Sequence, residues 1–252
     1  MTTSSADSSW IPEQWTFHDR KVAERFDTHV RESLPWYDLA TLGVAHFIRA
    51  YLPDGGRVLD VGASTGNIGR AVADLLSERD ATLVAVDNSA EMMEQYDAPG
   101  EPVIADIIDF DPPDCDVAVL FLVLMFIDPK RRRGIVQRIG RAVRPGGAII
   151  VVDRLPNPAG YLGETIHRLT LRQKKEAGVS LAEIAEKELS LIGRQRPVSP
   201  YLFDDWTEWL RIGEFAGFIR PVPEVGNESR DWTLAKIRPP GEIRATPYAD
   251  AP

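Results

Sequence analysis

The chain has almost no cysteine: Cys115 is the only one among its 252 residues. A single thiol cannot form a disulfide within the chain, so the disulfide framework of small secreted domains is excluded. Cys115 begins an apolar run, where we expect a buried structural thiol and not a nucleophile. This cysteine usage is typical of a reducing compartment and predicts a cytoplasmic protein.

Long hydrophobic runs are also missing. No stretch reaches the roughly 18 consecutive apolar residues that a membrane-spanning helix needs, so we expect no membrane partner. The first residues, MTTSSADSS, have neither the basic region nor the apolar core of a secretory signal. They are rich in serine, and residues 1–15 are predicted to form a disordered tail.

Positive charge is in deficit. Lys and Arg number 29 against 38 Asp and Glu, which gives a formal net charge of −9. Proteins that bind nucleic acids usually carry basic patches, so this balance favours a small-molecule substrate and argues against a nucleic-acid partner. The only dense basic run is Lys130-Arg131-Arg132-Arg133, which opens a predicted helix and is expected to form a solvated face.

The most informative segment present is RVLDVGASTGNIG, residues 57–69. A short apolar strand breaks on a glycine turn and a helix follows, which brings a nucleotide or nucleoside against bare backbone N–H groups. The glycines are Gly62, Gly66 and Gly69, and Ser64 stands where the pyrophosphate-binding fingerprint has its second glycine. The spacing therefore disfavours a diphosphate ligand.

Three later strand junctions narrow the range of possible ligands further. Asp87 ends the second predicted strand, where an acid can accept hydrogen bonds from both ribose hydroxyls. Asp106 and Ile107 end the third unit, and a long apolar run at 117–127 predicts a central parallel strand. Residues 144–147, Arg-Pro-Gly-Gly, precede a fifth strand at 148–152.

These ordered features resemble the class I S-adenosylmethionine-dependent methyltransferases. Asp60-Val61-Gly62 is similar to the start of their first motif, E/D-x-G-x-G-x-G, with Ser64 in place of the middle glycine. The resemblance implies an α/β, Rossmann-like class I methyltransferase fold. Its seven-stranded, mostly parallel sheet has helices on both faces and a helical insert after the fifth strand. It also implies S-adenosylmethionine as cofactor, with Asp106 meeting the adenine amino group.

The predicted domain plan is a single methyltransferase-fold domain at 16–237, with a Pro-rich tail at 238–252. Residues 16–56 form a helical N-terminal cap, and 154–217 form the helical insert. Within the insert we expect a helical segment over 160–192, broken at Gly178 and capped again by Ser180, and a helix over 204–217. Strands at 218–222 and 232–237 close the sheet. Trp206, Trp209 and Trp232 fit core positions.

A closer resemblance is to the carboxy-S-adenosylmethionine synthase family. It rests on FHDRKVAERFDTHVRESLPWYD, AVDNSAEM, MFIDP and, inside the insert, GETIHRLTLRQKKEAGVSLAEIAEK. The family's cofactor contacts match a tyrosine before the sheet, the glycine turn, a DN pair and a DI pair. The expected cofactor-binding residues are Tyr37, Asp60, Gly62, Ala63, Ser64, Gly66, Asp87, Asn88, Met92, Asp106, Ile107 and Phe121. We expect no metal.

The chain departs from this family at two positions. Phe121 stands where the family has an asparagine. The family's arginine, which pairs with the added carboxylate, matches Ile212, and Arg211 is one residue away. On a helix a one-residue shift turns a side chain by about 100°, so Arg211 is no simple substitute. The departures favour methyl transfer to a small molecule over carboxyl transfer.

Methyl transfer needs alignment of nucleophile, methyl group and sulfur more than it needs a fixed catalytic motif. The sequence therefore names no catalytic residue, only the candidates His167, Tyr37 and Arg154. For His18, His29 and His46 we expect a structural or surface role. Two alternatives stay open: a carboxy-S-adenosylmethionine synthase using prephenate, and a non-catalytic S-adenosylmethionine-binding protein. The insert is a candidate homodimer interface or pocket cover.

Overall fold

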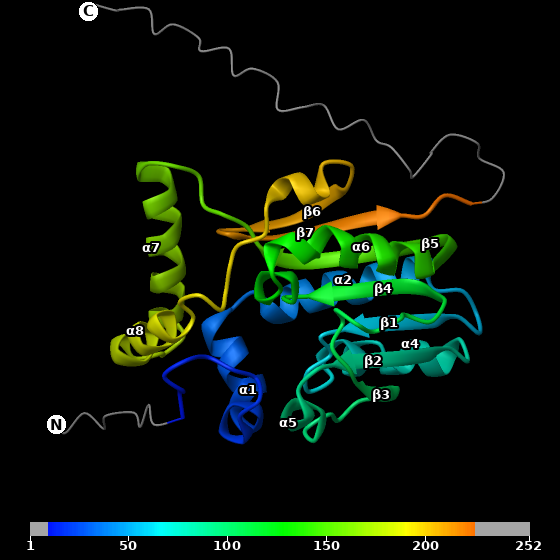
Figure 1. Ribbon diagram of the computed structural model, residues 1–252, viewed down its shortest axis with the longest axis horizontal. Coiled ribbons are helices and arrows are strands. Elements are labelled where there is room, and N and C mark those ends of the chain that lie inside the picture. The colour runs from blue at the N-terminus through cyan, green and yellow to red at the C-terminus, as the bar shows by residue number, and fades with distance from the viewer. Residues whose placement is uncertain (1–9, 225–252) are drawn as a thin grey trace, which may run out of the picture.

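A computed structural model describes residues 10–224 of the chain (Figure 1). One seven-stranded sheet has the order β3-β2-β1-β4-β5-β7-β6. The first five strands in this order pair in parallel, and β7 is antiparallel to both of its neighbours. The strands are β1 (Arg57–Val61), β2 (Thr82–Asp87), β3 (Glu101–Ile104), β4 (Cys115–Phe121), β5 (Val143–Arg154), β6 (Thr207–Ile212) and β7 (Phe215–Pro221). The predicted fold class is confirmed.

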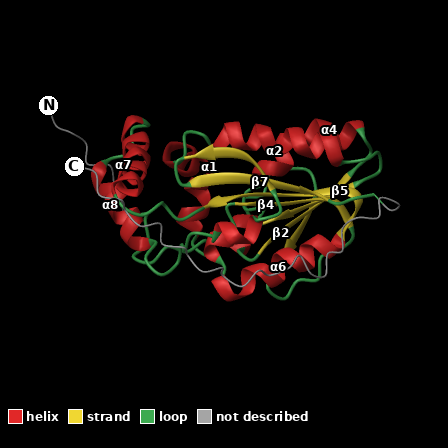
Figure 2. Ribbon diagram, turned by 90° about the horizontal axis from the view of Figure 1, so that it is seen from above, coloured by secondary structure: helices red, strands yellow, loops and turns green. Residues whose placement is uncertain are grey.

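Helices cover both faces of this sheet (Figure 2). On one face lie α2 (Tyr37–Tyr51), α3 (Asn67–Ala71) and α4 (Ala73–Glu78), and on the other lies α6 (Pro129–Ala142). Successive strand residues point to opposite faces, so Val58 joins the α2 side of the core and Leu59 joins the α6 side. Burial on both faces explains why the central strands are continuous apolar runs.

A third group of helices lies beyond the carboxyl ends of the parallel strands (Figure 1). It contains α1 (Arg20–Ser33), α7 (Tyr161–Glu176) and α8 (Leu181–Ser190), while the short α5 (Ala90–Met93) follows β2. The break at Gly178 is confirmed, and Ser180 caps α8 by accepting a hydrogen bond from the Glu183 N–H at 3.1 Å. Short 3-10 turns, η1 (Leu124–Phe126) and η2 (Pro200–Phe203), follow β4 and α8.

The helix expected over 204–217 is wrong, because this segment forms most of the β6–β7 hairpin. Gly213 has φ +57° and occupies the first position of the two-residue turn between the paired Ile212 and Phe215. Glycine is favoured at that position because its φ is positive. Trp209 is packed against Gly217 of β7 and Gly43 of α2. The strand expected at 232–237, with Trp232, lies outside the described residues.

Two expectations about single side chains have different outcomes. Cys115 is fully buried, as predicted, and burial raises the pKa of its thiol to about 12. The basic run is not wholly solvated, because Arg132 is buried at 4% exposure. Its guanidinium donates to the carbonyl oxygens of Ile127, Pro197 and Arg196 at 3.0, 2.8 and 2.7 Å. Arg132 thus joins the chain after α8 to α6 and to the residue that follows the 3-10 turn after β4. No helix among residues 10–224 is long and apolar enough to cross a membrane.

Candidate active site

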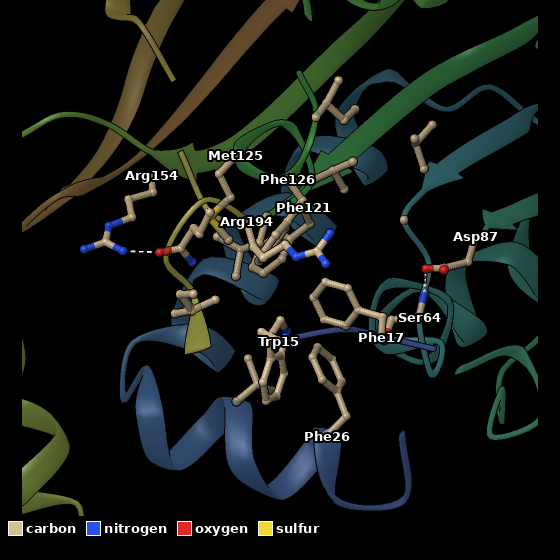
Figure 3. Close-up of a pocket in the computed structure, with 18 of the residues that line it drawn as sticks. Trp15, Phe17, Phe26, Ser64, Asp87, Phe121, Met125, Phe126, Arg154 and Arg194 are labelled. Atoms are coloured by element: carbon tan, nitrogen blue, oxygen red, sulfur yellow. Dashed lines mark hydrogen bonds between the residues drawn. The ribbon is translucent and has the colours of Figure 1, made fainter. Parts of the chain in front are cut away.

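A cavity of about 420 Å³ opens at the carboxyl ends of β1, β2 and β4, between the sheet, α1 and the insert (Figure 3). Its volume lies in the range of roughly 300–1,000 Å³ that small-molecule sites occupy. This is the edge at which open α/β sheets bind ligands. The predicted cofactor residues that line it are Tyr37, Asp60, Gly62, Ala63, Ser64, Asp87, Asn88, Asp106, Ile107 and Phe121.

The glycine turn is held by the protein itself. The N–H groups of Gly62 and Ala63 donate to the Val86 carbonyl at 2.7 and 3.1 Å, and that of Gly66 donates to the Ala63 carbonyl at 2.9 Å. Ser64 N–H donates to Asp87 Oδ2 at 2.9 Å. The expectation of bare N–H groups is therefore wrong for these four residues. These four N–H groups are already engaged within the protein.

Asp87 is held by backbone donors on two sides. Its Oδ2 accepts the Ser64 N–H at 2.9 Å (Figure 3). Its Oδ1 accepts the Ser89 N–H, also at 2.9 Å. Burial raises the pKa of Asp87, and the two backbone N–H groups oppose that rise. Each carboxylate oxygen has a second lone pair, so the fixed carboxylate can still accept hydrogen bonds from ribose hydroxyls.

Asp60 is a fully buried carboxyl group of the site with one oxygen that lacks a hydrogen-bond partner among the described residues. It is 1% exposed, and its Oδ2 has no hydrogen-bond partner among the described residues. Burial first, and then the charge of Asp87, raise the pKa of Asp60 to about 7. A buried acceptor without a donor costs folding free energy unless a ligand supplies the partner. S-adenosylmethionine carries a sulfonium and an α-ammonium group, so its charges fit this carboxylate.

The ends of β3 and β4 supply the remaining predicted contacts. Asp106 Oδ1 accepts the Ile108 N–H at 2.8 Å, which orients the carboxylate, and the buried Ile107 side chain lines the cavity. Tyr37 lies edge-on to Phe121 with ring centroids 5.2 Å apart. Burial raises the pKa of the Tyr37 hydroxyl above its ordinary value, so this group stays protonated and can donate a hydrogen bond.

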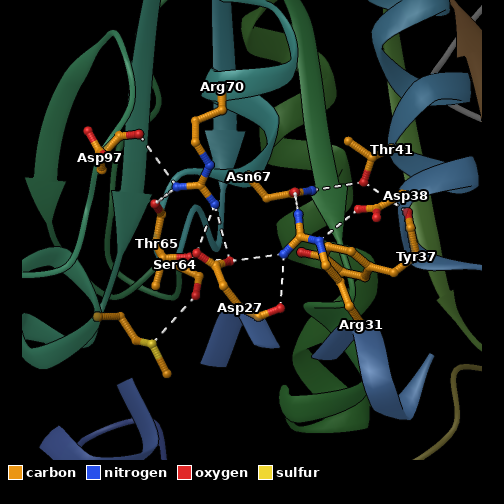
Figure 4. Close-up of polar contacts among 11 residues, drawn as sticks. Asp27, Arg31, Tyr37, Asp38, Thr41, Ser64, Thr65, Asn67, Arg70 and Asp97 are labelled. Carbon is orange, nitrogen blue, oxygen red and sulfur yellow. Dashed lines mark hydrogen bonds and ion pairs between the residues drawn. The ribbon is translucent and has the colours of Figure 1, made fainter. Parts of the chain in front are cut away.

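A polar cluster fastens α1 over the glycine turn (Figure 4). Asp27 accepts hydrogen bonds from Thr65 Oγ1 at 2.9 Å and from Arg70 Nη2 at 3.0 Å. Arg31 donates to Asn67 Oδ1 at 3.0 Å and to Asp38 Oδ1 at 2.9 Å. These contacts join α1 to the turn, to α3 and to α2. The sequence analysis missed this cluster, because its members lie far apart in the chain and form no motif.

Four predicted site residues either do not line the cavity or are paired with another residue. Gly66 and Met92 do not line the cavity, although Ser64 Oγ approaches Met92 Sδ at 3.5 Å and so supports the turn. His167 is on α7 and also does not line it. Arg154 does line it, but its Nη2 is paired with Glu214 Oε1 at 2.8 Å. No group of three or more His, Cys, Asp or Glu side chains suited to a metal occurs within residues 10–224.

The cavity also has residues that the sequence analysis did not identify. One wall is apolar and largely aromatic, and Arg194 reaches into the cavity beside it (Figure 3). We call this the aromatic wall; its members are Trp15, Phe17, Phe26, Met125 and Phe126. They come from the N-terminal segment, α1 and η1, and only the three-dimensional fold brings them together.

Comparisons with known proteins agree with this geometry. Residues 58–147 match a family model described as a methyltransferase domain. A carboxy-S-adenosyl-L-methionine synthase of Staphylococcus epidermidis is 26% identical over 225 residues, which are 84% of this chain and 98% of that protein.

Solved structures show the same fold. An O-methyltransferase family protein from Burkholderia thailandensis has a TM-score of 0.58 at 17% identity, covering 82% of this chain and 61% of that one. Human N-acetylserotonin methyltransferase in complex with S-adenosylmethionine has a TM-score of 0.51 at 12% identity, covering 81% and 55%. The chain therefore spans less than two thirds of these two proteins.

Together, the domain match, the fold and the acid-lined cavity define an S-adenosylmethionine-dependent transferase with a class I methyltransferase fold. S-adenosylmethionine is its cofactor. Within that class the chain is similar to the carboxy-S-adenosylmethionine synthases over most of its length.

Proposed function

We propose that this protein transfers the methyl group of S-adenosylmethionine to a small-molecule acceptor. The observation that carries the cofactor assignment is the unpartnered Oδ2 of Asp60, buried beside Asp87 at the carboxyl end of β1. Asp60, Asp87 and Asp106 give this end of the cavity negative charge, which complements a cationic nucleoside. The small-molecule acceptor is supported by the cavity volume and by the chain's net charge of −9.

Alignment and exclusion of water are the catalytic contributions that this cavity can make. The aromatic wall supplies an apolar lining close to the cofactor end. Burial lowers the pKa of His29 to about 3, so this lining histidine is neutral and a poor base near pH 7. Tyr37 stays protonated for the reason given above. The site therefore suits a nucleophile that needs little help in losing a proton.

Carboxyl transfer is the second candidate, because the chain resembles the carboxy-S-adenosylmethionine synthases. The structure gives it little support at the position of the family's arginine. Ile212 is on β6 and packs against the core, and successive residues of a strand face opposite sides. Arg211 is paired with Glu208 at 2.6 Å, and neither Arg211 nor Ile212 lines the cavity.

Mass analysis of the nucleoside pool separates these reactions. After incubation with S-adenosylmethionine and prephenate, we expect no nucleoside heavier than the cofactor by one carboxyl unit. With a cell extract of small molecules as acceptors, we expect S-adenosylhomocysteine to accumulate. Appearance of the carboxylated cofactor would establish the second candidate and overturn methyl transfer as the main activity. Binding without any product in either incubation would support a non-catalytic S-adenosylmethionine-binding protein.

We further propose that the protein is a cytoplasmic homodimer joined through α7 and α8. The sparse cysteine usage supports the compartment. The interface is supported by large apolar side chains that α7, α8 and the turn after α8 expose. Leu162, Leu181, Leu189 and Ile192 are 61, 67, 66 and 73% exposed.

Light scattering coupled to gel filtration tests this interface. The wild-type chain is expected at twice its monomer mass, and the double variant Leu181→Glu with Leu189→Glu at monomer mass, because two buried charges would oppose association. Leu42→Glu is the matched control, since Leu42 is 67% exposed on α2, which is not part of the proposed interface. A monomeric wild type, or a double variant that stays dimeric, would exclude this interface.

A further inference from the structure

Four cations line the part of the cavity next to the insert, which we call the insert half: Arg154, Lys174, Lys187 and Arg194. The aromatic wall extends from there to Ser64 at the acidic cofactor end (Figure 3). In the aromatic wall the Phe17 ring lies 5.0 Å from Phe126 and 6.0 Å from Phe26, each edge-on. Such a wall favours a flat apolar ring, because aromatic pairs gain from stacked and edge-on contacts. The cations next to it decide which ring compounds fit.

Two of the cations that line this half are neutralised by the protein. Arg154 is paired with Glu214 at 2.8 Å, and both side chains are largely buried. Lys174 is paired with Glu188 at 2.6 Å. Each pair contributes one positive and one negative charge, so neither leaves a free charge for a ligand.

The third cation of this half, Lys187, does not carry a permanent charge. Lys187 places its ammonium group against the Trp15 ring, and no ion pair involves it among the described residues. Burial and the neighbouring Lys174 lower the pKa of Lys187 well below its ordinary value. Its positive charge is therefore not fixed near neutral pH.

Arg194 is the fixed positive charge of this half. It lies on the turn after α8, and Nη2 donates to the amide oxygen of Gln14 at 2.8 Å. Within residues 10–224, no carboxylate lies within ion-pair distance of Arg194. A guanidinium stays charged at any physiological pH, and its planar fork matches a carboxylate with two parallel hydrogen bonds.

We propose that Arg194 binds the anionic group of the acceptor and that the acceptor is an aromatic carboxylate. The ring packs on the aromatic wall, and the carboxylate takes the place of the neutral Gln14 amide as the guanidinium's main partner. This assignment rests on the proposed function, since it names the substrate class of the same site. It also differs from the related synthases, whose arginine matches Ile212 and not Arg194.

Fluorine NMR titrations of the protein saturated with S-adenosylhomocysteine test this proposal, with para-fluorobenzoate as the probe and para-fluorobenzamide as its neutral counterpart. We expect saturable binding of the benzoate and an affinity about tenfold or more lower in Arg194→Gln. Benzamide should bind weakly and equally to both proteins. Arg196→Gln is the control, because Arg196 is an exposed cation two residues away that does not line the cavity. It should leave both affinities unchanged, and Arg194→Lys should recover part of the lost benzoate affinity.

Equal benzoate affinity in the wild type and Arg194→Gln would overturn the role of Arg194. Benzamide binding as tightly as benzoate would overturn the anionic acceptor. The affinity for S-adenosylhomocysteine is measured on the wild type and every variant by calorimetry. This measurement separates failure of the Arg194 inference from failure of the proposed function. If the cofactor product binds normally while benzoate is insensitive to Arg194, only this inference fails. If the cofactor product binds to no variant, the proposed function fails as well.

Discussion

Asp87→Ala is expected to weaken S-adenosylmethionine binding by about 100-fold or more. The substitution removes a carboxylate that can accept both ribose hydroxyls, and charge-assisted hydrogen bonds contribute about 1.5–3 kcal/mol each. It also removes the acceptor for the Ser64 and Ser89 N–H groups, each 2.9 Å away. The turn therefore loses its anchor to the end of β2. Isothermal calorimetry measures the dissociation constant directly.

Two controls make this result specific. Asp87→Asn keeps the shape and one acceptor oxygen, so its affinity should lie between those of the wild type and Asp87→Ala. Asp74→Ala removes an exposed carboxylate from the first turn of α4 and should leave the affinity unchanged. Full affinity in Asp87→Ala would refute the ribose assignment.

Cofactor affinity is expected to rise with pH between about 5 and 7, by as much as about tenfold per unit. Only the ionised form of Asp60 attracts a cation, and its pKa is raised to about 7 by burial and by Asp87. An α-ammonium group keeps its proton below about pH 7.7, so Asp60 is the partner that titrates in this interval. In Asp60→Asn the cofactor affinity should change little with pH. The difference between the wild-type and variant pH curves then isolates the contribution of Asp60 from that of Asp87. The same pH dependence in the wild type and Asp60→Asn would contradict the pairing of Asp60 with the cationic cofactor.

The same shift predicts the opposite trend for the cofactor-free protein. The ordinary pKa of the Asp60 carboxyl is 3.8 and the folded pKa is about 7, so folding favours the protonated form. Its contribution to the free energy of unfolding is fully present below about pH 4 and is lost as pH rises through 7. Asp153 is shifted to about 7 in the same direction. Urea unfolding measures the free energy of unfolding of the wild type and Asp60→Asn across this pH interval. That free energy should fall less with rising pH in the variant.

Much of the fold was predictable because its signals are local. β1 and β2 are short apolar runs that end before Gly62 and at Asp87, and the carboxyl ends of the parallel strands share one edge of the sheet. Asp60, Asp87 and Asp106 were predicted at that edge, and the cavity brings them together. The break between α7 and α8 followed from Gly178 and Ser180, whose conformations depend on neighbouring residues alone.

The remainder depended on contacts between distant segments. Residues 204–217 have helix-compatible side chains, yet Trp209 fits between Gly43 and Gly217 only in the hairpin. The turn at Gly213 was the local signal that the helix prediction overlooked. Likewise Arg194 belongs to no motif, and its place in the cavity depends on how the chain after α8 folds back, where Arg132 holds it.

Native mass spectrometry most directly tests the central claim that an acid-lined turn with Ser64 in place of the middle glycine selects a sulfonium nucleoside over a dinucleotide. The purified protein is incubated with S-adenosylmethionine in the presence of excess NAD. We expect one S-adenosylmethionine molecule per chain, undisplaced by NAD, and none in Asp87→Ala. A chain that binds NAD in its place, or that binds neither compound, would contradict the assignment of this cavity.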